Sequence, residues 1–132
     1  MPVTPHILYI EDNADNRTLV RRILMAVGID VVLEEAVSAL DGIKRALVAP
    51  PDLILIDLSM PGMDGLEATR RLRDHELLRE VPIVALTANV MEADRRRALD
   101  AGCDGYIGKP IDVDRFPGEI MSYLKKVRSP HD

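Results

Sequence analysis

Short apolar runs that end in polar residues recur along this chain, and they constrain its fold more than any other feature. The runs lie at 7–10, 53–56, 83–86 and 106–108, and the polar residues after them are Glu11, Asp12, Asp57, Thr87 and Lys109. Helical patterns separate the runs, which predicts repeated strand–helix units and a parallel sheet. In such a sheet, ligands bind outside the carboxyl ends of the strands. The sequence therefore predicts a pocket of three carboxylates, one hydroxyl and one ammonium group at this edge.

The same patterns predict the positions of the individual elements. Strands are expected at 6–11, 29–35, 52–57, 81–87 and 105–108, and helices at 14–27, 38–48, 64–74, 89–101 and within 112–127. Predicted helix caps are Ser38, Asp64 and Asn89 at the N-terminal ends and Gly28 at a C-terminal end. Pro117 and Gly118 fall inside the last helical segment, so this helix either begins late, with Pro117 in its first turn, or is kinked.

The strand patterns also predict the order of the sheet. Apolar and polar residues alternate over Ile29–Glu35, which is typical of an edge strand, whereas Leu53–Ile56 is apolar throughout, as in a strand covered on both faces. With right-handed crossovers, an edge position for the second strand suits the order 2-1-3-4-5. We therefore expect an α/β fold of the flavodoxin-like, doubly wound (βα)5 type with a five-stranded parallel sheet. Residues 1–132 are expected to form one domain with its core at about 6–127.

Length and composition exclude several classes of protein. A chain of 132 residues is large enough for one α/β domain. A net charge of −5, with no basic run longer than Arg95–Arg97, argues against direct nucleic-acid binding. Cys103 is the only cysteine, which excludes an internal disulfide and fits a reducing compartment. The sequence has no secretory signal and no apolar run of membrane-spanning length, so we expect a cytoplasmic protein without membrane contact.

The polar residues at the strand ends suit a divalent metal and a phosphoryl group. Mg²⁺, or Mn²⁺ in its place, prefers oxygen ligands and keeps several waters, so Asp12 and Asp57 suit direct ligation and Glu11 a contact through water. Without a metal, such close carboxylates should show at least one raised pKa. Asp57 is the natural nucleophile because an aspartate can accept a phosphoryl group as an acyl phosphate. Lys109 and Thr87 can contact other phosphoryl oxygens.

These motifs, taken in order, resemble the receiver domain of two-component response regulators. The matching segments are Glu11-Asp12, Leu53–Asp57, Met60–Gly65, Thr87–Asn89 and Gly102–Pro110. The resemblance covers essentially residues 6–127 and implies transfer of a phosphoryl group from a histidine kinase or a histidine phosphotransfer protein to Asp57 with Mg²⁺ present. It also implies that the phosphorylated chain acts by binding a downstream protein, or as a phosphorylation-dependent dimer, and not as an enzyme beyond its own phosphorylation and dephosphorylation.

The resemblance implies further roles at the pocket. The Lys109–Pro110 peptide bond is expected to be cis, and the backbone carbonyl of Ser59 to bind the metal. Thr87 and Tyr106 are expected to form the switch, which acts on the face made by the fourth helix, the fifth strand and the fifth helix. Ser59 and Asn89, two positions after Asp57 and Thr87, are expected to tune the phosphoryl lifetime.

Other interpretations remain open at this point. The chain could be a receiver domain excised from a hybrid kinase, or an interaction module that works without phosphorylation. A phosphatase of the haloacid dehalogenase type is disfavoured because it carries a second aspartate where this chain has Ser59. A flavin-binding module is also disfavoured, because Glu11 and Asp12 would repel its phosphate.

Overall fold

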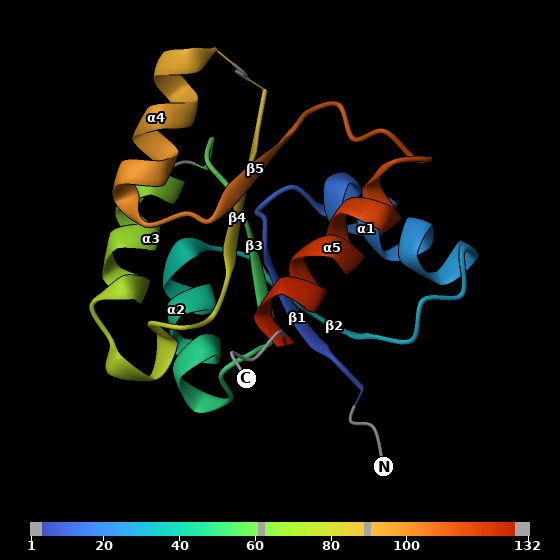
Figure 1. The fold of residues 1–132 in the computed structure, drawn as a ribbon, viewed down its shortest axis with the longest axis horizontal. Coiled ribbons are helices and arrows are strands. Elements are labelled where there is room, and N and C mark those ends of the chain that lie inside the picture. Colours follow the sequence, from blue (N-terminus) through green and yellow to red (C-terminus); the bar gives the residue numbers. More distant parts are fainter. Residues whose placement is uncertain (1–3, 61–62, 89–90, 129–132) are drawn as a thin grey trace.

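Strands and helices alternate along the chain in the computed structural model (Figure 1). The structure describes residues 4–60, 63–88 and 91–128, and for residues 125–128 it describes the backbone alone. The strands are β1 (His6–Ile10), β2 (Val32–Ala36), β3 (Leu53–Asp57), β4 (Ile83–Thr87) and β5 (Gly105–Gly108). The helices are α1 (Ala14–Ala26), α2 (Ala39–Val48), α3 (Gly65–Arg73), α4 (Glu92–Ala101) and α5 (Phe116–Arg128), with a short 3₁₀ helix η1 (Glu76–Leu78). Within this described part, no helix combines the length and apolar character that a membrane span requires.

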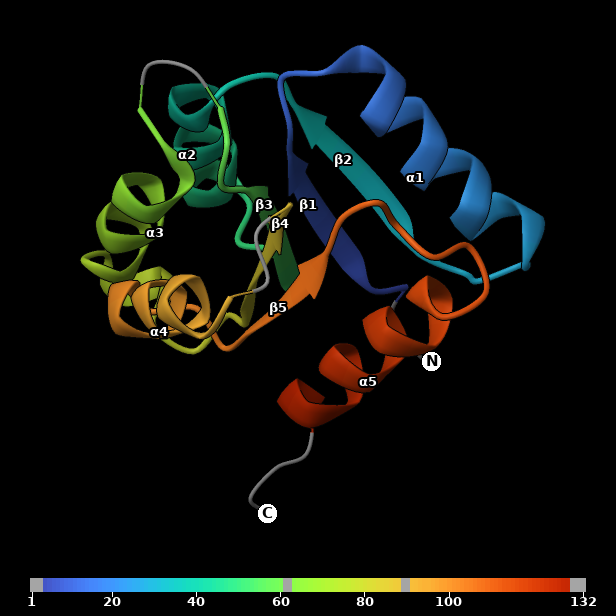
Figure 2. The same cartoon turned by 90° about the horizontal axis from the view of Figure 1, so that it is seen from above.

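The five strands form one parallel sheet in the order β2-β1-β3-β4-β5, which confirms the predicted topology. Helices α1 and α5 cover one face, and α2, α3 and α4 cover the other (Figure 2). Every residue of β3 and β4 is buried, as expected for central strands of a covered sheet. At the edge, Val32 of β2 is 53% exposed.

Alternation along the strands divides the core into two parts. Leu8 and Ile10 of β1 pack on the side of α2, α3 and α4. Ile7 and Tyr9, from the same strand, pack on the side of α1 and α5. Because side chains alternate between the two faces of a strand, an apolar run such as that in β1 supplies both cores at once.

Strand β2 begins at Val32 and not at the predicted Ile29, because Ile29 still belongs to the end of α1 and pairing with β1 starts at Val32, opposite His6. Helix α1 is capped by Val27, one residue before the predicted cap, and Gly28 follows with a φ of 71°. The N–H of Ile29 then donates to the carbonyl of Leu24, so it still belongs to the end of the helix. Glycine adopts this left-handed conformation without a steric cost.

Two of the predicted N-caps are confirmed. The side chains of Ser38 and Asp64 each accept a hydrogen bond from the backbone N–H three residues further on. The prediction for α4 was wrong: its N-cap is Met91, whose carbonyl accepts the N–H of Arg95, and no side-chain cap is formed. Asn89, the predicted cap, lies outside the described residues.

Helix α5 begins late, which confirms one of the two alternatives for Pro117. The helix begins at Phe116 and places Pro117 in its first turn, where a backbone N–H has no partner within the helix. The carbonyl of Asp112 accepts the N–H of Phe116, and its side chain accepts the N–H groups of Asp114 and Arg115. The preceding loop therefore supplies the acceptors for the start of the helix.

Candidate functional site

The predicted polar residues meet at the carboxyl edge of the sheet. Glu11 follows β1, while Asp57 and Thr87 are the last residues of β3 and β4. All three are buried, with exposed fractions of 0%, 3% and 6% respectively. Lys109 follows β5 and is half-buried, whereas Asp12 is exposed at the rim. The strand ends thus bring together two buried carboxylates, one exposed carboxylate, a buried hydroxyl and a half-buried ammonium group.

The three carboxylates lie close enough to share one cation. Glu11, Asp12 and Asp57 each offer an oxygen, and these oxygens all lie within 4.8 Å of one another. An octahedral Mg²⁺ site places neighbouring ligand oxygens roughly 3 Å apart and opposite ones roughly 4 Å apart. The cluster therefore fits a Mg²⁺ ion after a small contraction, and the exposed Asp12 leaves room for water ligands.

The closeness of the carboxylates shows in the pKa of Glu11. Burial raises its pKa above the ordinary value, and a hydrogen bond and the charge of Asp57 raise it further. The charge of Lys109 and the N–H of Asn13 act in the opposite direction. The expected raised pKa among these carboxylates is confirmed, and a bound cation would relieve the repulsion that contributes to it.

Lys109 neutralises part of the charge on the two buried carboxylates. Its Nζ lies 3.1 Å from Oδ1 of Asp57 and 3.5 Å from Oε1 of Glu11. Its backbone N–H donates to the carbonyl of Thr87 at 2.8 Å, which ties the loop after β5 to the end of β4. The Lys109–Pro110 peptide bond is cis, as the resemblance implied.

The turn after β3 begins at Asp57, the last residue of that strand. The N–H of Ser59 donates to Oδ1 of Asp57 at 3.0 Å, and the Ser59 residue is exposed. An open pocket of about 310 Å³ adjoins Ser59 and Thr87 at the mouth of the site. Metal ligation by the Ser59 carbonyl remains a prediction, and Asn89, the other predicted lifetime residue, lies outside the described residues.

Thr87 and Tyr106 lie on neighbouring strands. In the register of β4 and β5, Thr87 pairs with Gly108, and Tyr106 pairs with Ala85. Tyr106 is half-buried, and the guanidinium carbon of Arg95 on α4 lies 5.5 Å from the centre of its ring. An open pocket of about 530 Å³ runs past Arg95 and Tyr106 toward α5. Tyr106 thus borders an open surface between α4, β5 and α5, on the strand next to that of Thr87.

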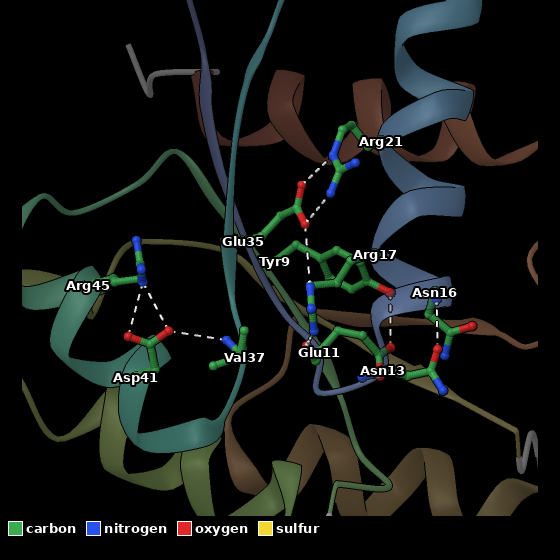
Figure 3. Close-up of polar contacts among 10 residues, drawn as sticks. All are labelled: Tyr9, Glu11, Asn13, Asn16, Arg17, Arg21, Glu35, Val37, Asp41 and Arg45. Carbon is green, nitrogen blue, oxygen red and sulfur yellow. Dashed lines mark hydrogen bonds and ion pairs between the residues drawn. The ribbon is translucent and has the colours of Figure 1, made fainter.

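Among the described residues, two side chains that sequence reasoning missed contact Glu11 (Figure 3). The hydroxyl of Tyr9 donates to Oε1 of Glu11 at 3.0 Å, and burial raises the Tyr9 pKa well above its ordinary value. Side chains two positions apart on a strand share a face, so this contact could have been predicted. Arg17 of α1 donates to the backbone oxygen of Glu11 at 2.7 Å. This contact depends on how α1 crosses the sheet, which local sequence does not specify.

Cys103 takes no part in the site. It is buried, and burial raises the pKa of its thiol to about 11. Its sulfur lies 3.8 Å from the hydroxyl of Thr69, on the face that α2, α3 and α4 cover. A protonated buried thiol is a packing group and not a nucleophile.

Comparison with known proteins identifies the class to which this fold and site belong. Residues 7–120 match the response regulator receiver domain family, and the chain belongs to that family. Such domains are signalling switches that interact with histidine kinases or phosphotransfer proteins and with downstream targets, and they bind Mg²⁺ at an acidic site. Membership excludes the phosphatase and flavin-module alternatives.

Particular relatives cover nearly the whole chain. The polar-differentiation response regulator DivK of Brucella ovis is 40% identical over 122 residues, which are 92% of this chain and 98% of that protein. The receiver domain of a Pseudomonas aeruginosa sensor histidine kinase, solved with a magnesium ion coordinated in its active-site cleft, is 33% identical. Its TM-score is 0.80, and the match covers 96% of this chain and all of that domain (100%).

The chemotaxis regulator CheY4 of Vibrio cholerae shares the fold at lower identity. Its TM-score is 0.84 at 22% identity, with 92% of this chain and 99% of that chain covered. The matches thus include both response regulators and the receiver domain of a sensor histidine kinase.

Proposed function

We propose that this chain is a phosphorylation-controlled switch in which Asp57 accepts a phosphoryl group from a histidine kinase or a histidine phosphotransfer protein. One observation carries the proposal. Asp57 is buried, its Oδ1 lies 3.1 Å from Nζ of Lys109, and one of its carboxylate oxygens lies within 4.8 Å of a carboxylate oxygen of Glu11 and of Asp12. Mg²⁺ or Mn²⁺ would be held by Asp12, Asp57 and the Ser59 carbonyl, with Glu11 acting through water. When bound, the cation neutralises charge on the transferring group.

The residues of the pocket have distinct parts in the transfer. An Asp57 carboxylate oxygen attacks phosphorus, the P–N bond to the donor histidine breaks, and the bonding electron pair remains on the imidazole. Lys109, whose ammonium lies 3.1 Å from Asp57, would pair with a phosphoryl oxygen. Thr87, buried at the end of the neighbouring strand, offers its hydroxyl to another.

The output would travel from Thr87 to Tyr106. A phosphoryl group adds strong acceptor oxygens, so the Thr87 hydroxyl gains a partner that exists only in the phosphorylated state. Movement of Thr87 would change the space open to the Tyr106 ring, which lies on the adjacent strand beneath Arg95. We propose that the surface of α4, β5 and α5 changes shape in this way and binds the downstream protein or a second phosphorylated copy.

The lifetime of the acyl phosphate would depend on the mouth of the pocket. Ser59 is exposed beside Asp57, and its short side chain does not extend toward an attacking water as an amide or carboxylate would. Asn89 is proposed as the second determinant of this lifetime. We therefore expect a lifetime that is neither very short nor extremely long.

The proposal is tested by small-molecule phosphorylation. With acetyl phosphate and Mg²⁺, intact-mass spectrometry at mildly acidic pH should show one added phosphoryl group on the wild-type chain. Asp57→Asn should show none, because an amide is a poor nucleophile. Asp64→Asn is the matched control, since Asp64 is an exposed helix cap and asparagine caps equally well. Wild-type labelling of Asp57→Asn would place the acceptor elsewhere.

A further inference from the structure

A chain of charged side chains attaches the turn that carries Glu11 and Asp12 to α1 and β2 (Figure 3). Nη1 of Arg17, from α1, donates to the backbone oxygen of Glu11 at 2.7 Å. Nε of the same guanidinium lies 3.5 Å from Oε1 of Glu35 on β2. The Arg17 side chain is 17% exposed, so much of this contact is shielded from water. One guanidinium thus joins the acidic turn to the neighbouring strand.

Glu35 is itself held in place. Arg21, one helical turn beyond Arg17, donates from Nε and Nη2 to the two Glu35 oxygens at 2.6 and 2.7 Å. This hydrogen bonding lowers the pKa of Glu35, which therefore remains a carboxylate. Bidentate arginine–carboxylate pairs have a well-defined geometry. Glu35 is consequently a fixed anchor for Arg17.

The contact with the Glu11 carbonyl has a direct consequence for Asp12. The N–H of Glu11 donates to the carbonyl of Ala36 at 3.0 Å, and its carbonyl oxygen is held by Arg17. Because a peptide unit is planar, the direction of the Glu11 carbonyl also sets the direction of the Asp12 N–H and of the bond leading to the Asp12 α-carbon. The orientation of this one peptide therefore sets the position of the Asp12 α-carbon, from which the exposed carboxylate side chain extends.

We propose that Arg17 is a positioning residue for the metal site: braced by Glu35, it fixes the Glu11–Asp12 peptide so that Asp12 faces the other two carboxylates. The inference rests on the proposed function, because it assigns Arg17 a role toward the Mg²⁺ that these carboxylates would hold. Partners that orient metal ligands commonly change metal affinity when they are removed.

Charge and positioning predict opposite effects for Arg17. A guanidinium close to a cation site repels the cation, so loss of its charge alone should strengthen Mg²⁺ binding. Loss of the hydrogen bond to the Glu11 carbonyl should instead weaken binding, because Asp12 must then be ordered when the metal binds. The sign of the change in affinity therefore separates the two effects.

The test compares Arg17→Met with Arg22→Met by titrating Mg²⁺ and following amide NMR shifts. Methionine keeps the length of the arginine stem and removes its donors, and Arg22 is an exposed arginine on the same helix. We expect Arg17→Met to bind Mg²⁺ on the order of tenfold more weakly, while Arg22→Met binds like the wild type. In metal-free protein, amide exchange at residues 12–14 should be faster in Arg17→Met alone.

Equal or tighter Mg²⁺ binding by Arg17→Met would overturn the inference and leave the proposed function intact. A wild-type chain that binds no Mg²⁺ would instead refute the metal site and, with it, this role of Arg17. If Arg17→Met does not fold, Arg17→Lys is judged by the same criterion. Lysine keeps the charge, but its single ammonium cannot reproduce the fork that contacts both Glu11 and Glu35, so weaker binding is again expected.

Discussion

Replacement of Lys109 by methionine should destabilise the metal-free protein and strengthen its binding of Mg²⁺. The Lys109 ammonium lies 3.1 Å from Asp57 and 3.5 Å from Glu11, both of which are buried. Methionine has a similar length and no charge, so the change removes the cation while retaining much of the packing. The two carboxylates are then left together without an opposite charge between them.

The distances give the size of the effect. At an effective dielectric constant of about 20, each of the two contacts corresponds to a gross attraction of roughly 5 kcal/mol. Desolvation of the ammonium offsets much of this, and breaking a fully buried pair costs about 3–5 kcal/mol. Because the Lys109 side chain is 20% exposed, we expect a somewhat smaller loss in the free energy of unfolding, about 2–3 kcal/mol. For a domain of this size the melting temperature should fall by on the order of 10 °C.

The loss should depend on pH in a defined direction. The charge of Lys109 lowers the pKa of Glu11, which burial and Asp57 raise, so its removal should raise that pKa further. A carboxyl group with a raised pKa in the folded state binds its proton more tightly there than in the unfolded chain. Its contribution to stability is therefore present at low pH and lost as pH rises through the folded pKa. The destabilisation by Lys109→Met should be largest at neutral and alkaline pH and should shrink on acidification.

Urea unfolding of wild type and Lys109→Met between pH 4 and 8, with and without Mg²⁺, measures the loss of stability, its dependence on pH and the stabilisation by Mg²⁺. Lys44→Met is the matched control, because Lys44 is an exposed lysine on α2. Mg²⁺ should restore more stability to Lys109→Met than to the wild type, since the competing ammonium is gone. Equal stability of the two proteins without metal, or a loss that grows on acidification, would refute this reasoning.

Two further predictions concern the same pocket. Glu11→Gln should stabilise the metal-free protein at neutral pH, because it removes a buried carboxylate whose pKa is raised. The gain in stability should vanish as pH falls and Glu11 itself becomes protonated. Thermal unfolding of both proteins at several pH values measures this, and a gain that persists at acid pH would contradict it. Thr87→Ala should still accept a phosphoryl group but should lose most of the change around Tyr106, as measured by amide exchange with and without beryllofluoride; a wild-type response would remove Thr87 from the switch.

Features set by local sequence were predictable. The continuous apolar run of β3 indicated a central strand, and all of its residues are buried. Ser38 and Asp64 cap their helices as their side chains suggest, since an N-cap hydrogen bond spans only three residues. The acidic cluster followed from the strand order, because adjacent parallel strands bring their carboxyl ends together.

Features that depend on long-range geometry were not predictable. The start of β2 was misplaced because Ile29, the first residue of the alternating segment, still belongs to the end of α1, and pairing with β1 starts only at Val32. Arg17 and Glu35 are distant in sequence, and their contact depends on how α1 packs beside β2. Each charged residue on a helix surface has many potential partners, and only the packed structure selects one.

The most direct test of Asp57 as the phospho-acceptor is chemical mapping of the modified residue. The chain is phosphorylated by a histidine phosphotransfer protein with Mg²⁺ and then treated with borohydride, which reduces an acyl phosphate to an alcohol and so converts aspartyl phosphate to homoserine. Tandem mass spectrometry of the resulting peptides should locate homoserine at position 57 and nowhere else. Homoserine at another aspartate, or a phosphoryl group that survives on a different residue type, would contradict the assignment of this pocket.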